Sequence, residues 1–202
     1  MQSRADENIN ATFERLFEVI RSEQFLGRKG LGNEVPFFIS AYHSTLQGKV
    51  DELVPILVTK LANQGVVPLH VDLYDLTVEI MHARGVWSRM VEKEAKIERE
   101  QFLKTLVNVT DAKETLVPLI ASKLAAAECQ VMLITGVGLV YPYVRSHKVL
   151  ENLQAVAKMT PTVLFLPGDY CFDESKGSYI RLFGVLPDDP YYRAFNIADF
   201  HP

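Results

Sequence analysis

The chain has 202 residues, of which 48 % are hydrophobic and 23 % are charged, values close to the average of globular domains. These values exclude a disordered, a collagen-like and a disulfide-rich chain. The 21 basic and 25 acidic residues leave a net charge of -4, so no overall positive field attracts the protein to nucleic acid or to an anionic membrane. A chain of this length predicts a single domain over residues 1–202.

The first half of the chain predicts alternating helices and strands. Apolar residues at helical spacing predict an amphipathic helix over 5–23, and an aromatic, apolar run predicts a buried strand over 36–42. A helix over 51–63 and a strand over 66–76 follow. The segment 81–107 carries opposite charges four residues apart and few apolar residues, which predicts a solvated helical excursion.

The next segment continues this alternation. It predicts a helix over 112–127, a strand over 130–136, a helix over 142–158 and a buried strand over 161–168. Pro142 is suited to the first position of the helix predicted over 142–158, since the N–H groups in the first turn of a helix have no intrahelical partners.

After residue 168 the alternation of helices and strands ends. Two runs, 178–186 and 191–197, flank Pro-Asp-Asp-Pro, which predicts a C-terminal antiparallel hairpin. The alternation before it predicts an α/β fold with a mainly parallel sheet flanked by helices in a three-layer sandwich. The similar segments 53–62 and 116–125, each with an early Pro, predict two equivalent helix–strand units on that sheet.

Nucleotide-hydrolysis motifs are incomplete. A P-loop needs Gly-x4-Gly-Lys-Ser/Thr after a strand. After the first predicted strand the chain keeps only Gly48 and Lys49, with His43 at the first glycine position and Val50 in place of the hydroxyl residue. The strand over 130–136 ends in glycines rather than in an acid that could hold magnesium.

Other catalytic or metal centres are not indicated either. Asp72 and Asp75 near a strand end could bind a metal, and helix capping or solvent exposure is the simpler interpretation. Cys129 and Cys171 belong to no CxxC pair, which favours two buried thiols. The sequence holds no Gly-x-Ser-x-Gly elbow and no His-Glu-x-x-His motif. We therefore predict no catalytic residue, no metal and no cofactor.

The compartment follows from the N-terminus and from hydropathy. The first residues are charged and lack the apolar region of a signal peptide, and no apolar run approaches the ~20 residues of a membrane span. We expect a cytoplasmic protein with reduced thiols and no membrane contact.

The segment after 130–136 is the most site-like in the chain. Gly136 and Gly138 lie between a strand and a helix, but Tyr141 stands where a dinucleotide motif needs its third glycine. Loops at the carboxyl ends of parallel strands collect ligands, so an anion or a partner could contact this edge; a tight turn is the alternative. The candidate residues are Lys29, Gly136, Gly138, Tyr141, Arg145, Ser146, His147 and Asp169.

Six blocks in chain order carry a family resemblance. They are KGLGNEVPFFI (29–39), VDLYDL (71–76), TGVGLVYPYVRSHKVLENLQ (135–154), VLFLPGDY (163–170), IRLFG (180–184) and YYRAFNI (191–197). Together they resemble the BrxB family of BREX (bacteriophage-exclusion) systems. The resemblance implies a P-loop-like or Rossmann-like sandwich and a role in bacterial antiviral defence. It also implies three partners: a DNA methyltransferase, a large ATPase and an alkaline-phosphatase-like protein. It transfers no catalytic residue.

The resemblance and the incomplete motifs favour a non-enzymatic adaptor that binds other BREX proteins. Aromatic and Arg side chains are favoured interface anchors, and the candidates are Trp87, Arg89, Tyr191, Tyr192 and Arg193. The alternative is a nucleotide- or phosphate-binding regulatory subunit with a degenerate P-loop-like fold. Direct nucleic-acid binding is a further hypothesis, which the acidic balance opposes.

Overall fold

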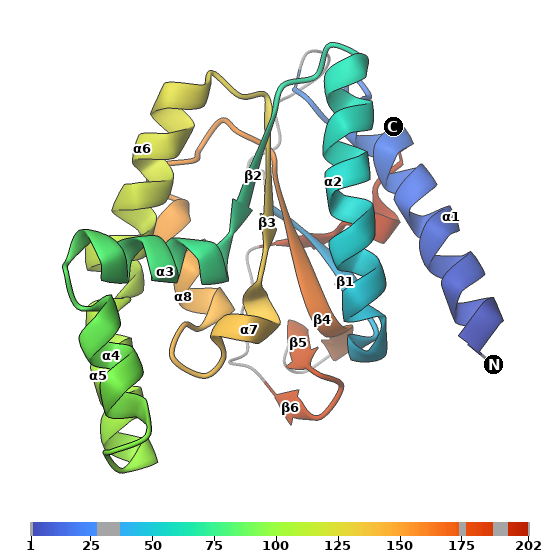
Figure 1. Ribbon diagram of the computed structural model, residues 1–202. Coiled ribbons are helices and arrows are strands. Elements are labelled where there is room, and N and C mark those ends of the chain that lie inside the picture. Colours follow the sequence, from blue (N-terminus) through green and yellow to red (C-terminus); the bar gives the residue numbers. More distant parts are fainter. Residues whose placement is uncertain (1, 28–36, 174–176, 188–193, 202) are drawn as a thin grey trace.

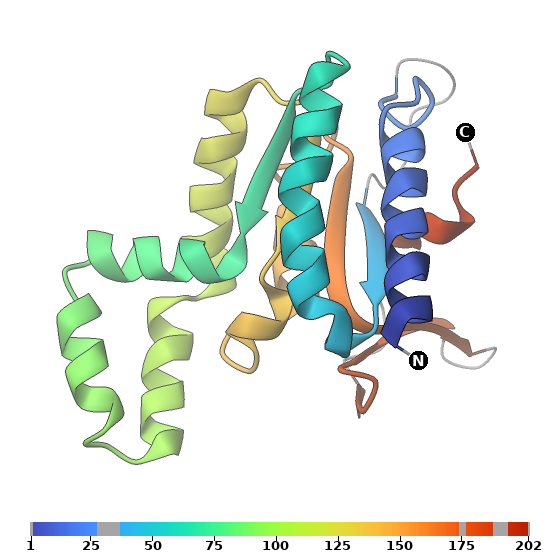
Figure 2. The same cartoon turned by 45° about the vertical axis from the view of Figure 1, so that its right-hand side comes forward.

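Five parallel strands form the central sheet of the protein. The computed structural model describes residues 2–27, 37–173, 177–187 and 194–201. The strand order is β2-β3-β4-β1-β7, and Figures 1 and 2 show helices on both sides of the sheet. This confirms the predicted α/β fold. The strands are β1 (Phe37–Tyr42), β2 (Pro68–Asp72), β3 (Val131–Thr135), β4 (Thr162–Asp173) and β7 (Phe195–Asn196).

The face of the sheet that each helix covers depends on the direction in which its crossover runs along the sheet. The chain leaves β1 for the far edge strand β2 by way of α2 (Gln47–Asn63), on the same face as α1 (Gln2–Ile20). It returns from β2 to β4 over the other face, which carries α6 (Val117–Ala127) and α8 (Ser146–Leu153). Right-handed crossovers require opposite faces for the two directions. The order separates β1 from β2, whereas these strands are neighbours in dinucleotide-binding sheets.

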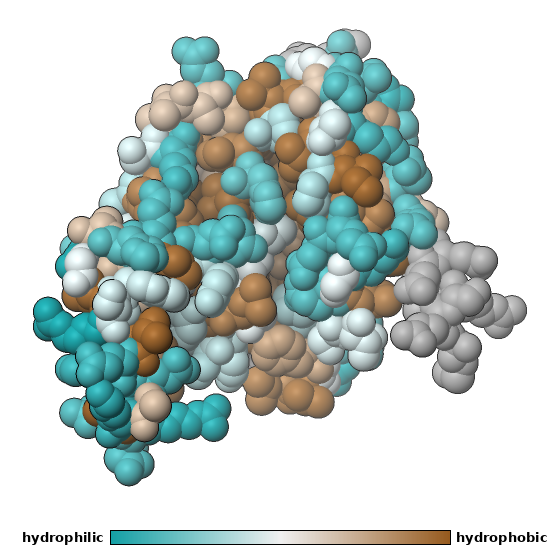
Figure 3. Space-filling view, in the orientation of Figure 1, coloured by the Kyte–Doolittle hydropathy of each residue, from teal (hydrophilic) through white to brown (hydrophobic). Residues whose placement is uncertain are grey.

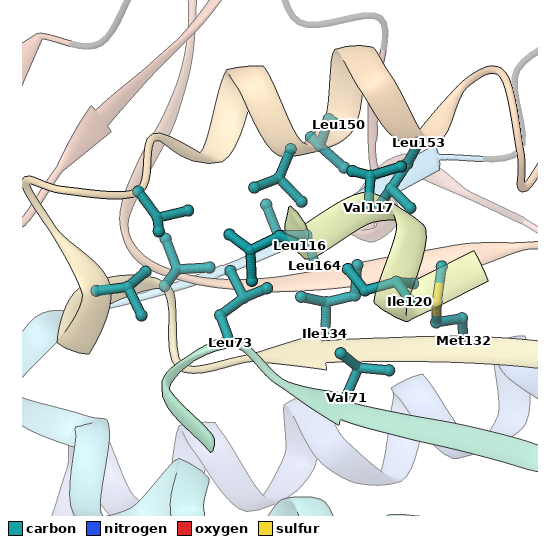
Figure 4. Packing of buried hydrophobic residues seen from close by; sticks show 14 of the residues in the cluster. Val71, Leu73, Leu116, Val117, Ile120, Met132, Ile134, Leu150, Leu153 and Leu164 are labelled. Atoms are coloured by element: carbon teal, nitrogen blue, oxygen red, sulfur yellow. The ribbon is translucent and has the colours of Figure 1, made fainter. Parts of the chain in front are cut away.

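Each face of the sheet has its own apolar core. Under α6 and α8, aliphatic side chains pack against β2, β3 and β4, as Figure 4 shows for Leu116, Ile120, Ile134 and Leu164. The core under α1 and α2 is richer in aromatic residues. It includes Phe25, whose ring centroid lies 4.8 Å from that of Phe38 and 5.4 Å from that of Phe200.

The strand predicted over 66–76 ends early. β2 stops at Asp72, and the following residues begin α3 (Leu73–Ala83). The Asp72 carboxylate accepts hydrogen bonds from the backbone N–H groups of Tyr74 and Asp75, at 2.8 and 3.1 Å. Capping of a helix is therefore the role of Asp72, in agreement with the simpler of the two interpretations.

The charged middle segment forms a helical arm, as predicted. α4 (Trp87–Glu94) and α5 (Arg99–Val109) project away from the sheet (Figure 2). Across these two helices, which the structure describes in full, Met90 is the one buried residue. The helix predicted over 112–127 begins with a π-helical turn over Ala112–Leu116 and becomes α-helical at Val117. We refer to α4 and α5 together as the arm.

The prediction for Pro142 is wrong. β3 leads through Gly136 into a short helix, α7 (Val137–Val140), and Pro142 follows in a turn after a cis peptide bond. α8 begins at Ser146. A glycine at φ 77° allows the sharp exit from β3, and this exit makes room for the additional helix that periodicity did not reveal.

The C-terminal hairpin is present, but its strands pair differently from the prediction. The second half of β4 pairs antiparallel with β5 (Gly177–Leu182), and β5 pairs with β6 (Leu186–Pro187). β7 instead joins β1 in parallel at the edge of the main sheet. The reason is that β4 extends well beyond the buried run and supplies the pairing edge for β5.

The two similar segments do not occupy equivalent positions. α6 begins with its Pro in the first turn, whereas Pro55 lies inside α2, which starts four residues earlier than predicted. The two helices also lie on opposite faces of the sheet. They precede the neighbouring parallel strands β2 and β3.

Candidate functional site

The candidate residues gather at the carboxyl ends of the parallel strands. In Figure 1 this end carries the start of α3, α7, and the turn between β5 and β6. In open parallel sheets this is the end where ligands and partners bind. We call it the carboxyl rim.

A polar network holds the edge of the sheet at this rim. The Thr135 hydroxyl donates to the Asp72 carboxylate at 2.8 Å, and its oxygen lies 2.8 Å from Nε2 of His70. Because the hydroxyl proton goes to the carboxylate, a neutral His70 must carry its own proton on Nε2. Asp72 bonds Thr135 and not the imidazole, so the order of a nucleophile–base–acid triad is not formed.

Burial lowers the pKa of His70 from its ordinary value, and the carboxylates of Asp72 and Asp75 oppose this shift. Desolvation also raises the pKa of Tyr143, whose hydroxyl lies 3.5 Å from that of Thr77. Both shifts favour the neutral form of the side chain.

Gly136 is required by its geometry. Its φ is 77°, a left-handed conformation, and a Cβ built on it would lie 2.6 Å from Oδ1 of Asp72. The backbone at Gly136 therefore packs directly against the carboxylate that caps α3. The glycine explains a tight turn, and the close contact leaves no open cradle over it.

Gly138 and Tyr141 meet the turn between β5 and β6. A Cβ on Gly138 would lie 3.0 Å from Pro167 and 3.1 Å from the ring of Phe183. The ring of Phe183 meets that of Tyr141 edge-on at 5.9 Å, and the guanidinium of Arg145 lies 4.7 Å from the centre of the Tyr141 ring. Three of the predicted residues are thus brought together around Phe183, a residue that the sequence did not single out.

The other predicted rim residues are separated or already engaged. Asp169 forms an ion pair with Arg181 of β5, at 2.9 Å. Ser146 is buried and His147 half-buried at the start of α8, and both have interaction partners. Lys29 lies outside the described residues.

The position of a phosphate-binding loop after β1 is filled by helix. Ser44–Leu46 form a 3-10 turn that runs directly into α2, and the His43 side chain caps that turn by accepting from the N–H of Thr45. Lys49 is ion-paired with Glu52 at 2.9 Å. Within the described segment 43–50, the backbone is therefore helical from Ser44 onward, and no extended glycine-rich loop separates β1 from α2.

Apolar side chains are exposed along the rim. Leu139 is 55 % exposed and Val185 72 % exposed, and Tyr74 is exposed at the start of α3. With Tyr141 and Phe183 they form what we call the apolar rim: Tyr74, Leu139, Tyr141, Phe183 and Val185. Figure 3 shows apolar surface in this region, over α7 and the β5–β6 turn. Phe183 and Gly184 both have positive φ, and the N–H of Val185 donates to the carbonyl of Leu182, as in the tight turns of β-hairpins.

The partner-interface candidates are only partly described. Trp87 begins α4 and stacks on His82, with ring centroids 5.0 Å apart. Arg89 is exposed on the same helix. Tyr191, Tyr192 and Arg193 lie outside the described residues.

Cys129 and Cys171 are free and half-buried, so the prediction of two buried thiols is not met in full. Within residues 2–27, 37–173, 177–187 and 194–201, no three His, Cys, Asp or Glu side chains lie close enough together to hold a metal. Over the same ranges, no helix combines the length and hydrophobicity needed to cross a bilayer.

The geometry thus defines an α/β protein with an apolar rim. Comparison with known proteins places it further. The profile of the family "BREX protein BrxB" matches residues 69–197. A protein named BREX protein BrxB from Bacillus cereus (strain H3081.97) is 31 % identical over 197 residues, covering 95 % of this chain and 98 % of the relative. The chain belongs to the BrxB family.

A second BREX protein BrxB, from Escherichia coli O9:H4 (strain HS), is 28 % identical over 176 residues, covering 84 % of this chain and 87 % of the relative. No solved structure matches the chain. The recognition of the family from six sequence blocks is confirmed.

Proposed function

We propose that the protein is a non-enzymatic adaptor of a BREX phage-defence system and that it binds another BREX protein through its apolar rim. The observation that carries this proposal is the exposure of Leu139 and Val185 at the carboxyl rim. Contiguous apolar residues on a folded surface mark contact sites, since their burial against a partner is favourable by about 25 cal/mol per Å².

The state of the polar residues at the rim supports binding rather than catalysis. Asp72 caps α3 and holds Thr135, and Asp169 is paired with Arg181. His43 and Val50 replace two residues of the phosphate-binding motif, and Lys49 is ion-paired with Glu52, so we do not favour the nucleotide- or phosphate-binding alternative. The partners to test are the alkaline-phosphatase-like protein, the large ATPase and the DNA methyltransferase.

Pairwise co-purification with each of these proteins tests the proposal. Wild-type protein should form a stable complex with at least one of them. Val185→Glu should weaken that complex at least tenfold, because a buried charge without a partner is costly. Ile56→Glu is the control: Ile56 is also an exposed aliphatic residue, at 53 %, but lies on α2.

Loss of binding by Val185→Glu but not by Ile56→Glu supports the adaptor function and its surface. Absence of a complex between the wild-type protein and any of the three contradicts the function. Equal binding by wild type and Val185→Glu contradicts the assignment of the rim.

A further inference from the structure

An apolar groove lies between the arm and the carboxyl rim. Its volume is about 210 Å³, and α3, α4, α5 and α7 all contribute to its walls. Met81 and Met90 are buried at 5 % exposure and form its floor, and Val91 and Leu139 are more than half exposed at its margin. Methionine side chains adapt readily to different apolar groups.

The groove has the size of one large side chain. An apolar cavity of about 150 Å³ accommodates a benzene ring. A space of this volume with apolar walls therefore fits one aromatic or large aliphatic group from outside. Trp87, Phe102 and Leu106 add to the apolar walls, and Tyr74 and Tyr143 also line the groove.

One carboxylate breaks the apolar character of the groove. Glu94 is the last residue of α4 and lines the groove. Among the described residues it forms no ion pair, whereas Glu92 and Glu100 of the arm are paired with Lys96 and Lys104.

The placement of Glu94 also opposes the helix macrodipole. The C-terminus of a helix carries a partial negative charge, so an acidic side chain is unfavourable there. The carboxylate and the negative helix end lie together at one end of an apolar groove, where they are complementary to a cation; Lys93, in the same last turn, does not line the groove.

From this charge distribution we propose that the groove binds a segment of the partner that carries one bulky apolar side chain next to a Lys or Arg. The apolar side chain fills the space over Met81 and Met90, and the cation pairs with Glu94. The inference rests on the adaptor function and specifies the chemistry of its partner. Arg145 is held over the ring of Tyr141 and does not line the groove, so it does not occupy the place proposed for the partner's cation.

Photo-crosslinking tests the occupant. Benzoylphenylalanine replaces Val91 in the full chain, and the purified complex with the BREX partner is irradiated and its crosslinked peptides sequenced by mass spectrometry. The same residue at Ile56 is the control, because the two positions have nearly equal exposure, 52 % and 53 %. We expect a crosslink from position 91 only, to a segment with a bulky apolar residue and a Lys or Arg within one helical turn.

Charge reversal tests the cation. Glu94→Lys should weaken the complex at least tenfold, while Glu92→Lys, on the same helix but outside the groove, should change it less than twofold. Both variants are on an exposed helix and should fold. Equal effects of the two substitutions overturn the proposed ion pair.

The outcomes separate this inference from the adaptor function. A complex that forms without a crosslink at position 91 and tolerates Glu94→Lys overturns the groove and leaves the adaptor function standing. A crosslink to an acidic segment, or to a second copy of this chain, also overturns it. Failure of the wild-type protein to form any complex contradicts the adaptor function itself.

Discussion

Substitution of Gly136 by Ala tests the close contact at the centre of the rim. The new side chain would stand in a left-handed conformation, which costs an ordinary residue about 1–2 kcal/mol. Its Cβ would also lie 2.6 Å from Oδ1 of Asp72, so the carboxylate must move and weaken the cap of α3, which costs about 1 kcal/mol more. The expected loss in the free energy of unfolding is about 2–3 kcal/mol.

Gly65→Ala is the matched control for this prediction. Gly65 has nearly the same φ, 76°, but no atom of the described residues would lie within 4 Å of a Cβ built on it. Only the conformational cost of about 1–2 kcal/mol should remain. Urea unfolding followed by circular dichroism measures both variants.

A double-mutant cycle isolates the contact. On an Asp72→Ala background the carboxylate is gone, and Gly136→Ala should then cost no more than Gly65→Ala. Equal losses for Gly136→Ala and Gly65→Ala in the otherwise wild-type protein would refute the reasoning, since the contact with Asp72 would then contribute nothing.

Three further predictions concern other parts of the fold. Gly168→Ala would drive its Cβ into the carbonyl oxygen of Arg181, a backbone atom that cannot yield, so a loss of about 3 kcal/mol or failure to fold is expected in thermal unfolding. Phe25→Ala should cost about 3–5 kcal/mol by the same measurement, because its buried ring packs against two others. The folded state lowers the pKa of His70 below its ordinary value of 6.5. As the pH falls below about 6.5, the unfolded chain therefore binds a proton more readily than the folded protein, and the free energy of unfolding decreases. His70→Gln should reduce this slope between about pH 8 and 5.5, and an unchanged slope would contradict it.

Much of the fold follows from hydrophobic patterning. Buried strands such as 36–42 and 130–136 are evident because parallel strands covered on both faces are continuous apolar runs. The arm is also predictable from its pattern, because opposite charges four residues apart and few apolar residues are typical of a solvated helix. Both patterns are local, and the elements that they predict are the ones found in the folded protein.

The errors arise where one polar atom or one distant strand decides the local structure. Apolar residues continue past Asp72 within 66–76, but the Asp72 carboxylate ends the strand by capping α3. The pairing of β5 depends on the extension of β4, which no local pattern encodes. The first is a local capping interaction within three residues, and only the second is tertiary context that overrides propensity.

The sequence predicted some of the residues that lie at the carboxyl rim but not the contacts that they make there. Gly136, Gly138 and Tyr141 do lie at the rim, because a loop after a parallel strand must. Phe183 and Leu139 were missed, since their role depends on the turn between β5 and β6 meeting α7. The Phe-Gly dipeptide after an alternating run is a turn signal that could have indicated Phe183.

Hydrogen–deuterium exchange of the protein alone and in complex with its BREX partner tests the central claim most directly. We expect slower exchange on complex formation in residues 137–145 and 182–186, which include four of the five apolar-rim residues, and no change in α1 or α2. Protection confined to α1 and α2, with the rim exchanging as in the free protein, would contradict an adaptor that binds through its carboxyl rim.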